Sequence, residues 1–283
     1  MLAGQGQSES GRPIGLTVIA PACDEASNIG PLVRRVGDAC ARTGRSFEFI
    51  VVDDASGDGT PDAVRAMMER HDWLRLVSLP KPEKRTSNGQ SAAFEGGIEA
   101  ARGTLIAMLD ADLQNDPGDL PGLIETMDAT GADLVQGDRT RARRAGDAWI
   151  RRIGSGVGRL ARRVILSDPT RDTGCSLRVM TREVAAALPL DLRGMHRFIP
   201  VTARAMGFTV VEVEVSHGPR HSGTTKYGMG ISSRAIPGLI DCFAVRWMIG
   251  RVWKPAARAE GRPPAPASAV EAKAGRQREE AVR

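Results

Sequence analysis

The sequence predicts an α/β fold built on a mostly parallel sheet with helices on both faces. Short apolar runs alternate with stretches of about ten residues in which apolar positions recur at helical spacing. The runs are nearly continuous, which is typical of strands buried on both faces of a parallel sheet. Three of the runs end in acidic residues, and parallel sheets bind ligands at the carboxyl ends of their strands. The pattern therefore predicts the fold class and the edge that carries the site.

The expected elements follow one another along the chain. Strands are expected where apolar residues run together, at residues 16–21, 47–54, 74–79, 104–112, 132–137, 177–180 and 209–215. Helices are expected where apolar residues recur every three or four positions, around residues 29–36, 64–68 and 119–129. Residues 90–102 are rich in small side chains, which predicts a helix that packs closely on the sheet. Residues 139–163 hold nine arginines among apolar positions, which predicts a basic loop leading into a basic amphipathic helix.

The chain divides into four expected segments. Residues 1–13 are polar and rich in Gly and Ser, and we expect them to be disordered. Residues 14–228 are expected to form the folded domain that carries the site. Residues 229–253 are amphipathic, and residues 254–283 are Pro, Ala and charge, typical of a disordered tail.

Composition excludes several classes of protein. The 283 residues include 41% apolar residues, and 39 Lys+Arg against 34 Asp+Glu give a net charge of +5. This excludes a wholly disordered chain, a collagen-like chain and a disulfide scaffold. The four cysteines are scattered without a CxxC pair, so neither a zinc site nor a disulfide framework is indicated. The N-terminus lacks the features of a signal peptide, and charges interrupt the longest apolar window, so we expect a cytoplasmic protein without a spanning helix.

Acidic residues follow three of the expected strands. Asp24 and Glu25 follow the first strand, Asp53 and Asp54 end the second, and Asp110 and Asp112 end the fourth. Because these strand ends meet at one edge of a parallel sheet, we expect a site for a cation or for hydrogen-bond donors of a ligand.

The DAD sequence at Asp110–Asp112, with Gln114 beyond it, offers hard oxygen ligands of the kind that Mg²⁺ and Mn²⁺ prefer. The alternative is an Asp-rich loop in which Asp116 and Asp119 cap the next helix.

Three other segments have two interpretations each. In VDDASGDGT (52–60) an acid can accept a bond from a base or ribose while Thr60 caps the next helix, or the segment is a plain turn capped by Asp58. PACDE (21–25) either lines a ligand pocket or simply leads into the next helix, with its acids near the positive end of the helix dipole. The loop from Arg220 to Tyr227 clamps a diphosphate or is a solvated basic turn.

Taken together and in order, these motifs resemble those of the family 2 glycosyltransferases with the GT-A (Rossmann-like) fold. More narrowly, they are similar to the polyprenyl-phosphate glycosyltransferases, of the dolichyl-phosphate mannosyltransferase type. The matching segments are PACDE (21–25), VDDASGDGT (52–60), NGQSAAFEGGIEAARG (88–103), LDADLQNDP (109–117), DTGCSLR (172–178), HRFIP (196–200) and RHSGTTKYG (220–228). Two of the motifs depart from the usual pattern: Cys23 and Asp24 replace an aromatic residue and an amide in the first, and Thr225 replaces a serine in the last.

The resemblance implies a role for each matching residue. The nucleotide sugar would meet Pro21, Glu25, Asp53, Asp54 and Asp110. A Mg²⁺ or Mn²⁺ ion would be held by Asp110, Asp112 and Gln114. The phosphate of the acceptor lipid would meet Arg139. The residues expected to act on the reacting groups are Asp112, Arg220 and Lys226.

The resemblance also implies a reaction. A hexose of the mannose or glucose type would pass from a GDP- or UDP-linked donor to a polyprenyl phosphate, with inversion. The reaction would need no strong general base, because the acceptor phosphate is already anionic. The enzyme would be peripheral or monotopic on the inner face of the cell membrane, with residues 229–253 as interfacial helices. The alternative is that the amphipathic segment packs on the protein's own core. One alternative is a family 2 enzyme that acts on a hydroxyl, with Asp172 as the candidate base. A nucleic-acid partner is not expected, because binding by base stacking needs several aromatic residues and Trp149 is the only one in the arginine-rich stretch. Two other hypotheses are that the protein forms a homo-oligomer and that it is a membrane adaptor without catalytic activity.

Overall fold

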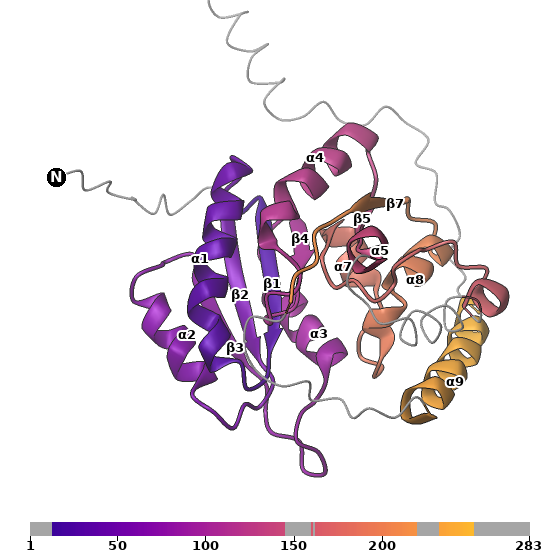
Figure 1. Ribbon diagram of the computed structural model, residues 1–283, viewed down its shortest axis with the longest axis horizontal. Helices are drawn as coiled ribbons and strands as arrows, with labels where there is room; N and C mark the ends of the chain where they lie inside the picture. Colours follow the sequence, from indigo (N-terminus) through magenta and orange to yellow (C-terminus); the bar gives the residue numbers. More distant parts are fainter. Residues whose placement is uncertain (1–12, 145–159, 161, 220–231, 252–283) are drawn as a thin grey trace, which may run out of the picture. The chain divides into compact units, whose positions relative to one another are not determined.

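The computed structural model describes residues 13–144, 160, 162–219 and 232–251 of the chain (Figure 1). All of them belong to one compact unit, Met1–Val252. Several segments with expected roles lie outside the described residues: Arg220 and Lys226, the arginine-rich residues 145–159, and the termini that were expected to be disordered. Of the N-terminal segment, only Pro13 is described.

A sheet of seven strands organises the described part of the chain, in the order β3-β2-β1-β4-β6-β5-β7. The strands are β1 Leu16–Ala22, β2 Phe47–Asp53, β3 Leu74–Ser78, β4 Leu105–Met108, β5 Leu134–Asp138, β6 Arg178–Thr181 and β7 Val210–Glu214. β6 runs antiparallel to both of its neighbours, β4 and β5, and the other pairings are parallel. The predicted mostly parallel α/β sheet is confirmed.

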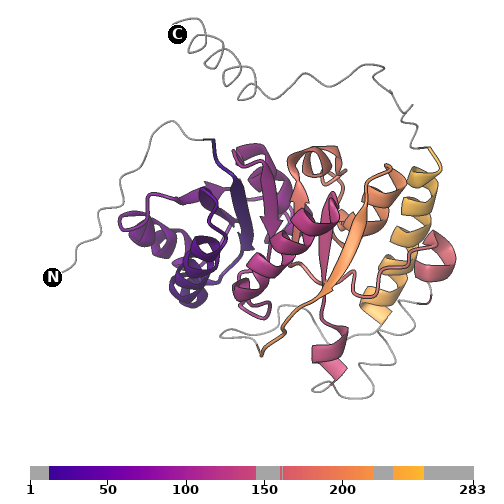
Figure 2. The same cartoon turned by 90° about the horizontal axis from the view of Figure 1, so that it is seen from above.

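Helices cover both faces of this sheet, as Figure 2 shows from above. The helices of the described chain include α1 Ala26–Arg42, α2 Thr60–Met68, α3 Gln90–Ala100, α4 Leu120–Thr130, α5 Thr140–Arg144, α7 Arg182–Ala187, α8 Ile199–Ala205 and α9 Ser232–Ile249. Two short 3-10 turns are η1 Pro117–Asp119 and η2 Met195–Arg197. One core lies between the sheet and α1, α2 and α4, and a second between the sheet and α3, α7, α8 and α9. Alternate residues of β1 enter opposite cores, because successive strand side chains point to opposite faces.

The small residues of α3 let it approach the sheet as expected. A Cβ added at Gly97 would lie 2.4 Å from Cγ2 of Ile19 on β1, so only glycine fits this approach. One expected boundary was wrong: the strand expected over residues 104–112 ends at Met108, and a turn begins at Ala111, directly after Asp110. Leu113, in this turn, has a φ of 61°. Asp110 therefore lies between the end of the strand and the turn, and Asp112 lies in the turn, so the side chains of both acids depend on other segments for orientation.

No helix among the described residues is long and apolar enough to cross a membrane.

Candidate active site

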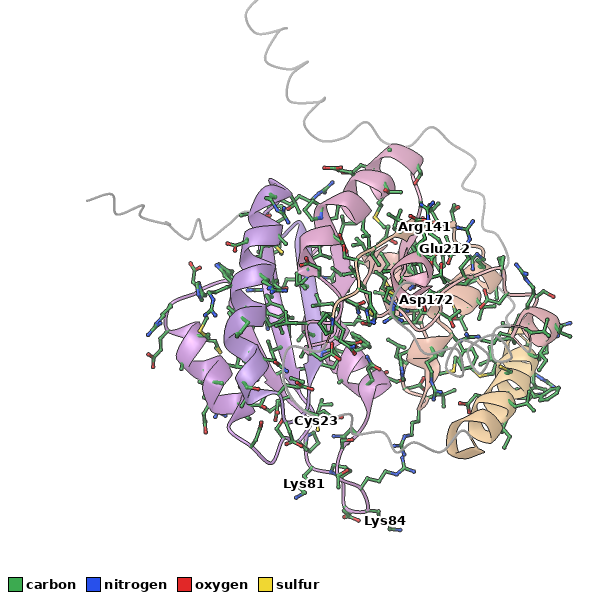
Figure 3. All side chains as sticks on the ribbon, in the orientation of Figure 1. Cys23, Lys81, Lys84, Arg141, Asp172 and Glu212 are labelled. Carbon is green, nitrogen blue, oxygen red and sulfur yellow. The ribbon has the colours of Figure 1, made fainter. Side chains whose placement is uncertain are left out.

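The expected acidic ends of β1, β2 and β4 do meet at one edge. β1 lies between β2 and β4 and runs parallel to both, and Ala22 at its end pairs with Asp53. Figure 3 labels Cys23 at this edge, and Asp172 on the side of the molecule where β5–β7 lie. The carboxyl edge of the sheet thus gathers the segments that the sequence singled out.

Asp24, one of the three residues that depart from the family pattern, ties two of these segments together. Its backbone has a φ of 51°, and its carboxylate accepts a hydrogen bond from the backbone N–H of Gly57 at 2.6 Å. Its own N–H donates to the hydroxyl of Ser56 at 2.9 Å. The charge of Asp24 therefore meets a backbone donor of the 52–60 loop, and residues 21–25 and 52–60 form one structural unit.

Glu25 and Asp58 extend this unit to the starts of α1 and α2. The N–H of Glu25 donates to the hydroxyl of Thr60 at 2.8 Å, and its carboxylate accepts from the amide of Asn28. Asp58 accepts from the N–H groups of Ala26 at 3.1 Å and Thr60 at 2.9 Å. Burial raises the pKa of Asp58, but the hydrogen bonds that it accepts from the hydroxyl of Thr60 and from these two N–H groups outweigh burial, and the pKa is lowered overall. The expectation that Thr60 caps α2 was wrong, because Thr60 is the first residue of the helix and Gly59 is its N-cap residue. Asp58, the cap in the plain-turn alternative, is not the N-cap residue either, although its carboxylate accepts the N–H of Thr60.

Asp54 fixes the start of α3. Its carboxylate accepts from the N–H of Asn88 at 2.7 Å, the side-chain amide of Asn88 at 3.0 Å and the N–H of Gly89 at 2.8 Å. Gly89 has a φ of 101°, a backbone conformation that favours glycine. Asp53 and Asp54 are both buried, and Asp53 accepts from the N–H of Ser56 at 3.3 Å. The second strand end is therefore joined to a segment more than thirty residues further on.

Asp110 is held by two other side chains. The amide of Gln90, at the start of α3, donates to Oδ1 of Asp110, and the hydroxyl of Ser176 is a second hydrogen-bond partner. Burial and the nearby charge of Asp112 raise the pKa of Asp110, while Ser176 and two arginines act in the opposite direction. Asp112 is buried, and its Oδ1 accepts from the backbone N–H of Gln114 at 3.0 Å. The DAD segment thus presents two carboxylates whose charges interact.

These residues suit a divalent ion by their chemistry. Among the described residues, no group of three or more His, Cys, Asp or Glu side chains could hold a metal. The expected set contains only two carboxylates, with Gln114 as its third member. Asp112 raises the pKa of Asp110 because two like charges are close, and a divalent cation bound to both would remove that cost. Two carboxylates and an amide are the hard oxygen ligands that Mg²⁺ and Mn²⁺ accept.

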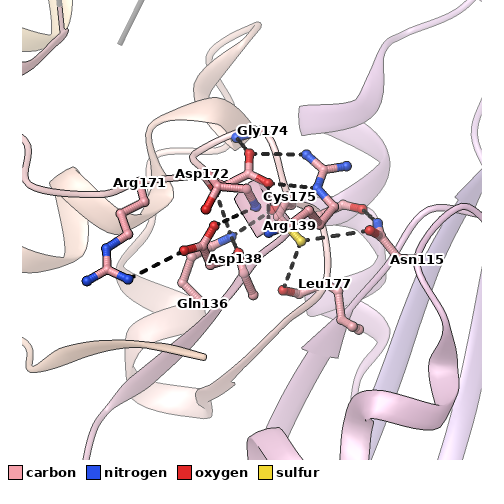
Figure 4. Close-up of polar contacts among 12 residues, drawn as sticks. Asn115, Gln136, Asp138, Arg139, Arg171, Asp172, Gly174, Cys175 and Leu177 are labelled. Carbon is pink, nitrogen blue, oxygen red and sulfur yellow. Dashed lines mark hydrogen bonds and ion pairs between the residues drawn. The ribbon is translucent and has the colours of Figure 1, made fainter. Parts of the chain in front are cut away.

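Arg139 is paired more firmly than the sequence suggested. Its guanidinium donates from Nε to Oδ2 of Asp172 at 2.8 Å and from Nη2 to Oδ1 at 3.2 Å, and both side chains are less than a tenth exposed (Figure 4). Burial lowers the pKa of Arg139, but its hydrogen bonds to Asp172 outweigh burial and raise it overall. Arg139 therefore adjoins the site as half of a buried ion pair.

Two residues of the site have roles that the sequence did not predict, although they lie in segments that match the family pattern. Arg178 is buried and donates to backbone carbonyls of Cys175, Ser176 and His196, and burial lowers its pKa to about 10. His196 contacts the hydroxyl of Ser91 through Nδ1 at 2.9 Å, and burial, followed by the charges of Arg197 and Arg178, lowers its pKa to about 3. A neutral imidazole thus joins residues 196–200 to α3.

Together these features define an α/β protein whose sheet edge carries a pair of interacting carboxylates, joined by hydrogen bonds to the first turn of α3 and to the approach to β6. The chain belongs to glycosyl transferase family 2, which its residues 17–188 match.

Several curated relatives act on lipid phosphates, as their names say. A dodecaprenyl-phosphate galacturonate synthase from Rhizobium johnstonii is 33% identical over 240 residues, which are 84% of this chain and 69% of the relative. An undecaprenyl-phosphate 4-deoxy-4-formamido-L-arabinose transferase from Pseudomonas aeruginosa is 37% identical over 216 residues, which are 76% of this chain and 61% of the relative. This chain thus spans between three fifths and seven tenths of the length of these relatives.

Solved structures show the same fold. Glucosyl-3-phosphoglycerate synthase from Mycobacterium tuberculosis, in complex with Mn²⁺, UDP-glucose and phosphoglyceric acid, has a TM-score of 0.61 and 18% identity, over 82% of this chain and 80% of that one. At this identity the likeness concerns the fold alone, and it confirms the expected GT-A architecture.

Proposed function

We propose that the protein transfers a sugar from a nucleotide-diphosphate sugar to a polyprenyl phosphate at a membrane surface. The observation that carries this proposal is the pair Asp110 and Asp112 at the edge where β1, β2 and β4 end, in a chain whose relatives act on dodecaprenyl and undecaprenyl phosphate. The whole activity, including the acceptor, is inferred from that combination.

The donor would lie along the strand ends. Pro21, Glu25, Asp53 and Asp54 would meet the base and ribose, although Asp54 already accepts three hydrogen bonds from Asn88 and Gly89. We therefore expect Asp54 to shape the pocket mainly by holding the start of α3. A Mg²⁺ or Mn²⁺ ion held by Asp110, Asp112 and Gln114 would offset the charge of the leaving diphosphate.

The acceptor would supply its own nucleophile. A phosphate monoester is anionic near neutral pH, so its oxygen can displace the diphosphate at the anomeric carbon, with inversion, without a strong base. Arg139, Arg220 and Lys226 would balance the charge of the phosphates. The hydroxyl-acceptor alternative needs a carboxylate base, and its candidate, Asp172, is engaged by Arg139 at 2.8 Å, which favours the phosphate acceptor.

The transferred sugar is proposed to be a hexose of the mannose or glucose type, carried by GDP or UDP. The named relatives widen the set to be tested, because one is a galacturonate synthase and the other transfers a formamido-arabinose.

The exposed face of α9 supports docking on a membrane. Cys242 and Val245 are buried in the core between α9 and the sheet, whereas Leu239, Ile240, Phe243 and Trp247 are exposed. The guanidinium of Arg251 lies 4.5 Å from the centre of the Trp247 ring. An exposed apolar face bordered by arginines suits a helix that lies in the lipid headgroup region. We propose a peripheral or monotopic location on the inner face of the cell membrane.

A transfer assay tests the proposal. Purified protein is incubated with radiolabelled nucleotide sugars, including UDP-galacturonate, UDP-glucose and GDP-mannose, with undecaprenyl phosphate and Mg²⁺ or Mn²⁺. We expect metal-dependent label in the organic phase, and we expect Asp112→Ala to abolish it while leaving the circular dichroism spectrum unchanged. Glu125→Ala, on the outer helix α4, is the matched control. Label in a water-soluble polymer would favour the hydroxyl acceptor, and full activity of Asp112→Ala would refute the metal assignment.

A further inference from the structure

Asp110 lies where the strand no longer fixes it. β4 ends at Met108, and the chain turns through Leu113, which has a φ of 61°. A carboxylate beyond the end of a strand can adopt several rotamers, and binding an ion would then cost the entropy of ordering it. Two side chains from different parts of the chain donate hydrogen bonds to Asp110 and restrict its orientation.

The first donor, Gln90, is on a helix start that is itself fixed. Gln90 is the first residue of α3, and the two residues before it are bonded to the carboxylate of Asp54, with their backbone N–H groups at 2.7 and 2.8 Å. Its side-chain amide donates to Oδ1 of Asp110. The position of this donor is therefore set by the second strand end of the site.

The second donor, Ser176, is placed by the antiparallel strand. β6 pairs with β4 so that Arg178 lies opposite Met108, and Ser176 comes two residues before Arg178, as Asp110 comes two residues after Met108. The hydroxyl oxygen of Ser176 accepts from the amide of buried Asn115 at 2.7 Å. Because a hydroxyl has one proton to donate, the bond between Ser176 and Asp110 is left to that proton.

We propose that Gln90 and Ser176 are positioning residues that clamp the carboxylate of Asp110 in the orientation in which it binds a divalent metal together with Asp112. This inference rests on the proposed function in one respect, since it takes Asp110 and Asp112 as metal ligands. Residues that orient a metal ligand from outside the coordination shell typically change metal affinity by about 10- to 100-fold when they are replaced.

Direct metal binding tests the clamp without donor or acceptor. The full chain is titrated with Mn²⁺, and free Mn²⁺ is measured by electron paramagnetic resonance. We expect Gln90→Met and Ser176→Ala each to weaken Mn²⁺ binding by about tenfold or more, because each removes a donor. Ser91→Ala is the matched control, since the Ser91 hydroxyl contacts His196 and not Asp110, and it should bind Mn²⁺ like the wild type.

Kinetics add a second readout. In the transfer assay, Gln90→Met should raise the Mn²⁺ concentration needed for half-maximal rate by a similar factor, with a much smaller change in kcat at saturating Mn²⁺. A merely structural role would lower the melting temperature without this selective shift. If Ser176→Ala does not fold, Gln90→Met alone decides the question.

The possible failures can be told apart. Wild-type Mn²⁺ affinity in both Gln90→Met and Ser176→Ala, with affinity lost in Asp110→Asn, would overturn the clamp and leave the proposed function standing. Wild-type affinity in Asp110→Asn would overturn the metal assignment and the clamp with it.

Discussion

The buried pair of Arg139 and Asp172 gives the sharpest test of how this site is built. We consider Arg139→Met, which keeps most of the side-chain volume and removes the charge, and Asp172→Asn, which keeps the shape. Arg139 donates twice to the carboxylate, at 2.8 and 3.2 Å, and Asp172 also accepts from the N–H of Arg139 at 3.2 Å and that of Gly174 at 3.2 Å. Arg139→Met therefore leaves a carboxylate with backbone donors but without its countercharge.

The expected cost follows from burial. With both side chains less than a tenth exposed, removing one partner should cost about 3–5 kcal/mol of unfolding free energy. The double variant Arg139→Met/Asp172→Asn removes both charges while Asn still accepts from the backbone, so it should be about 1–2 kcal/mol more stable than Arg139→Met alone.

Urea unfolding of the two single variants and the double variant measures this coupling. The acceptor assay then separates the two roles of Arg139. If Arg139 also binds the lipid phosphate, the double variant should regain stability but keep a raised KM for undecaprenyl phosphate. A loss below about 1 kcal/mol in Arg139→Met, with no coupling, would refute the argument from burial. A wild-type KM in the double variant would remove Arg139 from the acceptor site.

Three further predictions concern stability and reactivity. Burial raises the pKa of Glu48, but its hydrogen bonds to two arginines and a threonine lower it overall, so unfolding free energy should fall as the pH drops below about 4.3, and Glu48→Gln should flatten that fall in urea titrations. A Cβ at Gly103 would lie 2.4 Å from the backbone nitrogen of Thr17, so Gly103→Ala should cost about 1–3 kcal/mol in the same assay, and an unchanged midpoint would contradict the contact. Burial raises the pKa of Cys40 to about 12, so iodoacetamide at pH 8 should label the half-buried Cys23 before the buried Cys40, as mass spectrometry can show. A donor nucleotide should slow the labelling of Cys23. Equal labelling rates for Cys23 and Cys40 would contradict the argument from burial.

Much of the fold could be predicted from local sequence. Continuous apolar runs indicated the strands, and apolar residues at helical spacing indicated the helices. Both signals could be found in each segment by itself, because the apolar pattern of a strand or helix depends only on which of its faces are buried. The direction of β6 was not predictable in the same way. Residues 177–180 look like any buried strand, and only their partners β4 and β5 determine that they run antiparallel.

The site was predictable in part for the same reason. The acids at the ends of β1 and β2 and beyond β4 stood out because each follows an apolar run. The partners of these acids did not, because Asn88 lies 34 residues from Asp54 and Gln90 lies 20 residues before Asp110, and no periodicity links them. The buried Arg178 and the neutral His196 lay in quoted motifs, but their roles come from tertiary contacts alone.

The place of β6 has a consequence for synthesis on the ribosome. β4 and β5 emerge first but do not pair with each other, and the strand that joins them begins only at Arg178. Until then the edges of β4 and β5 that pair with β6 are open, and their unsatisfied backbone groups invite aggregation. The late strand that closes this gap also brings Ser176 to Asp110, so a nascent chain that stalls before residue 176 would lack both the finished sheet and one side of its proposed metal site.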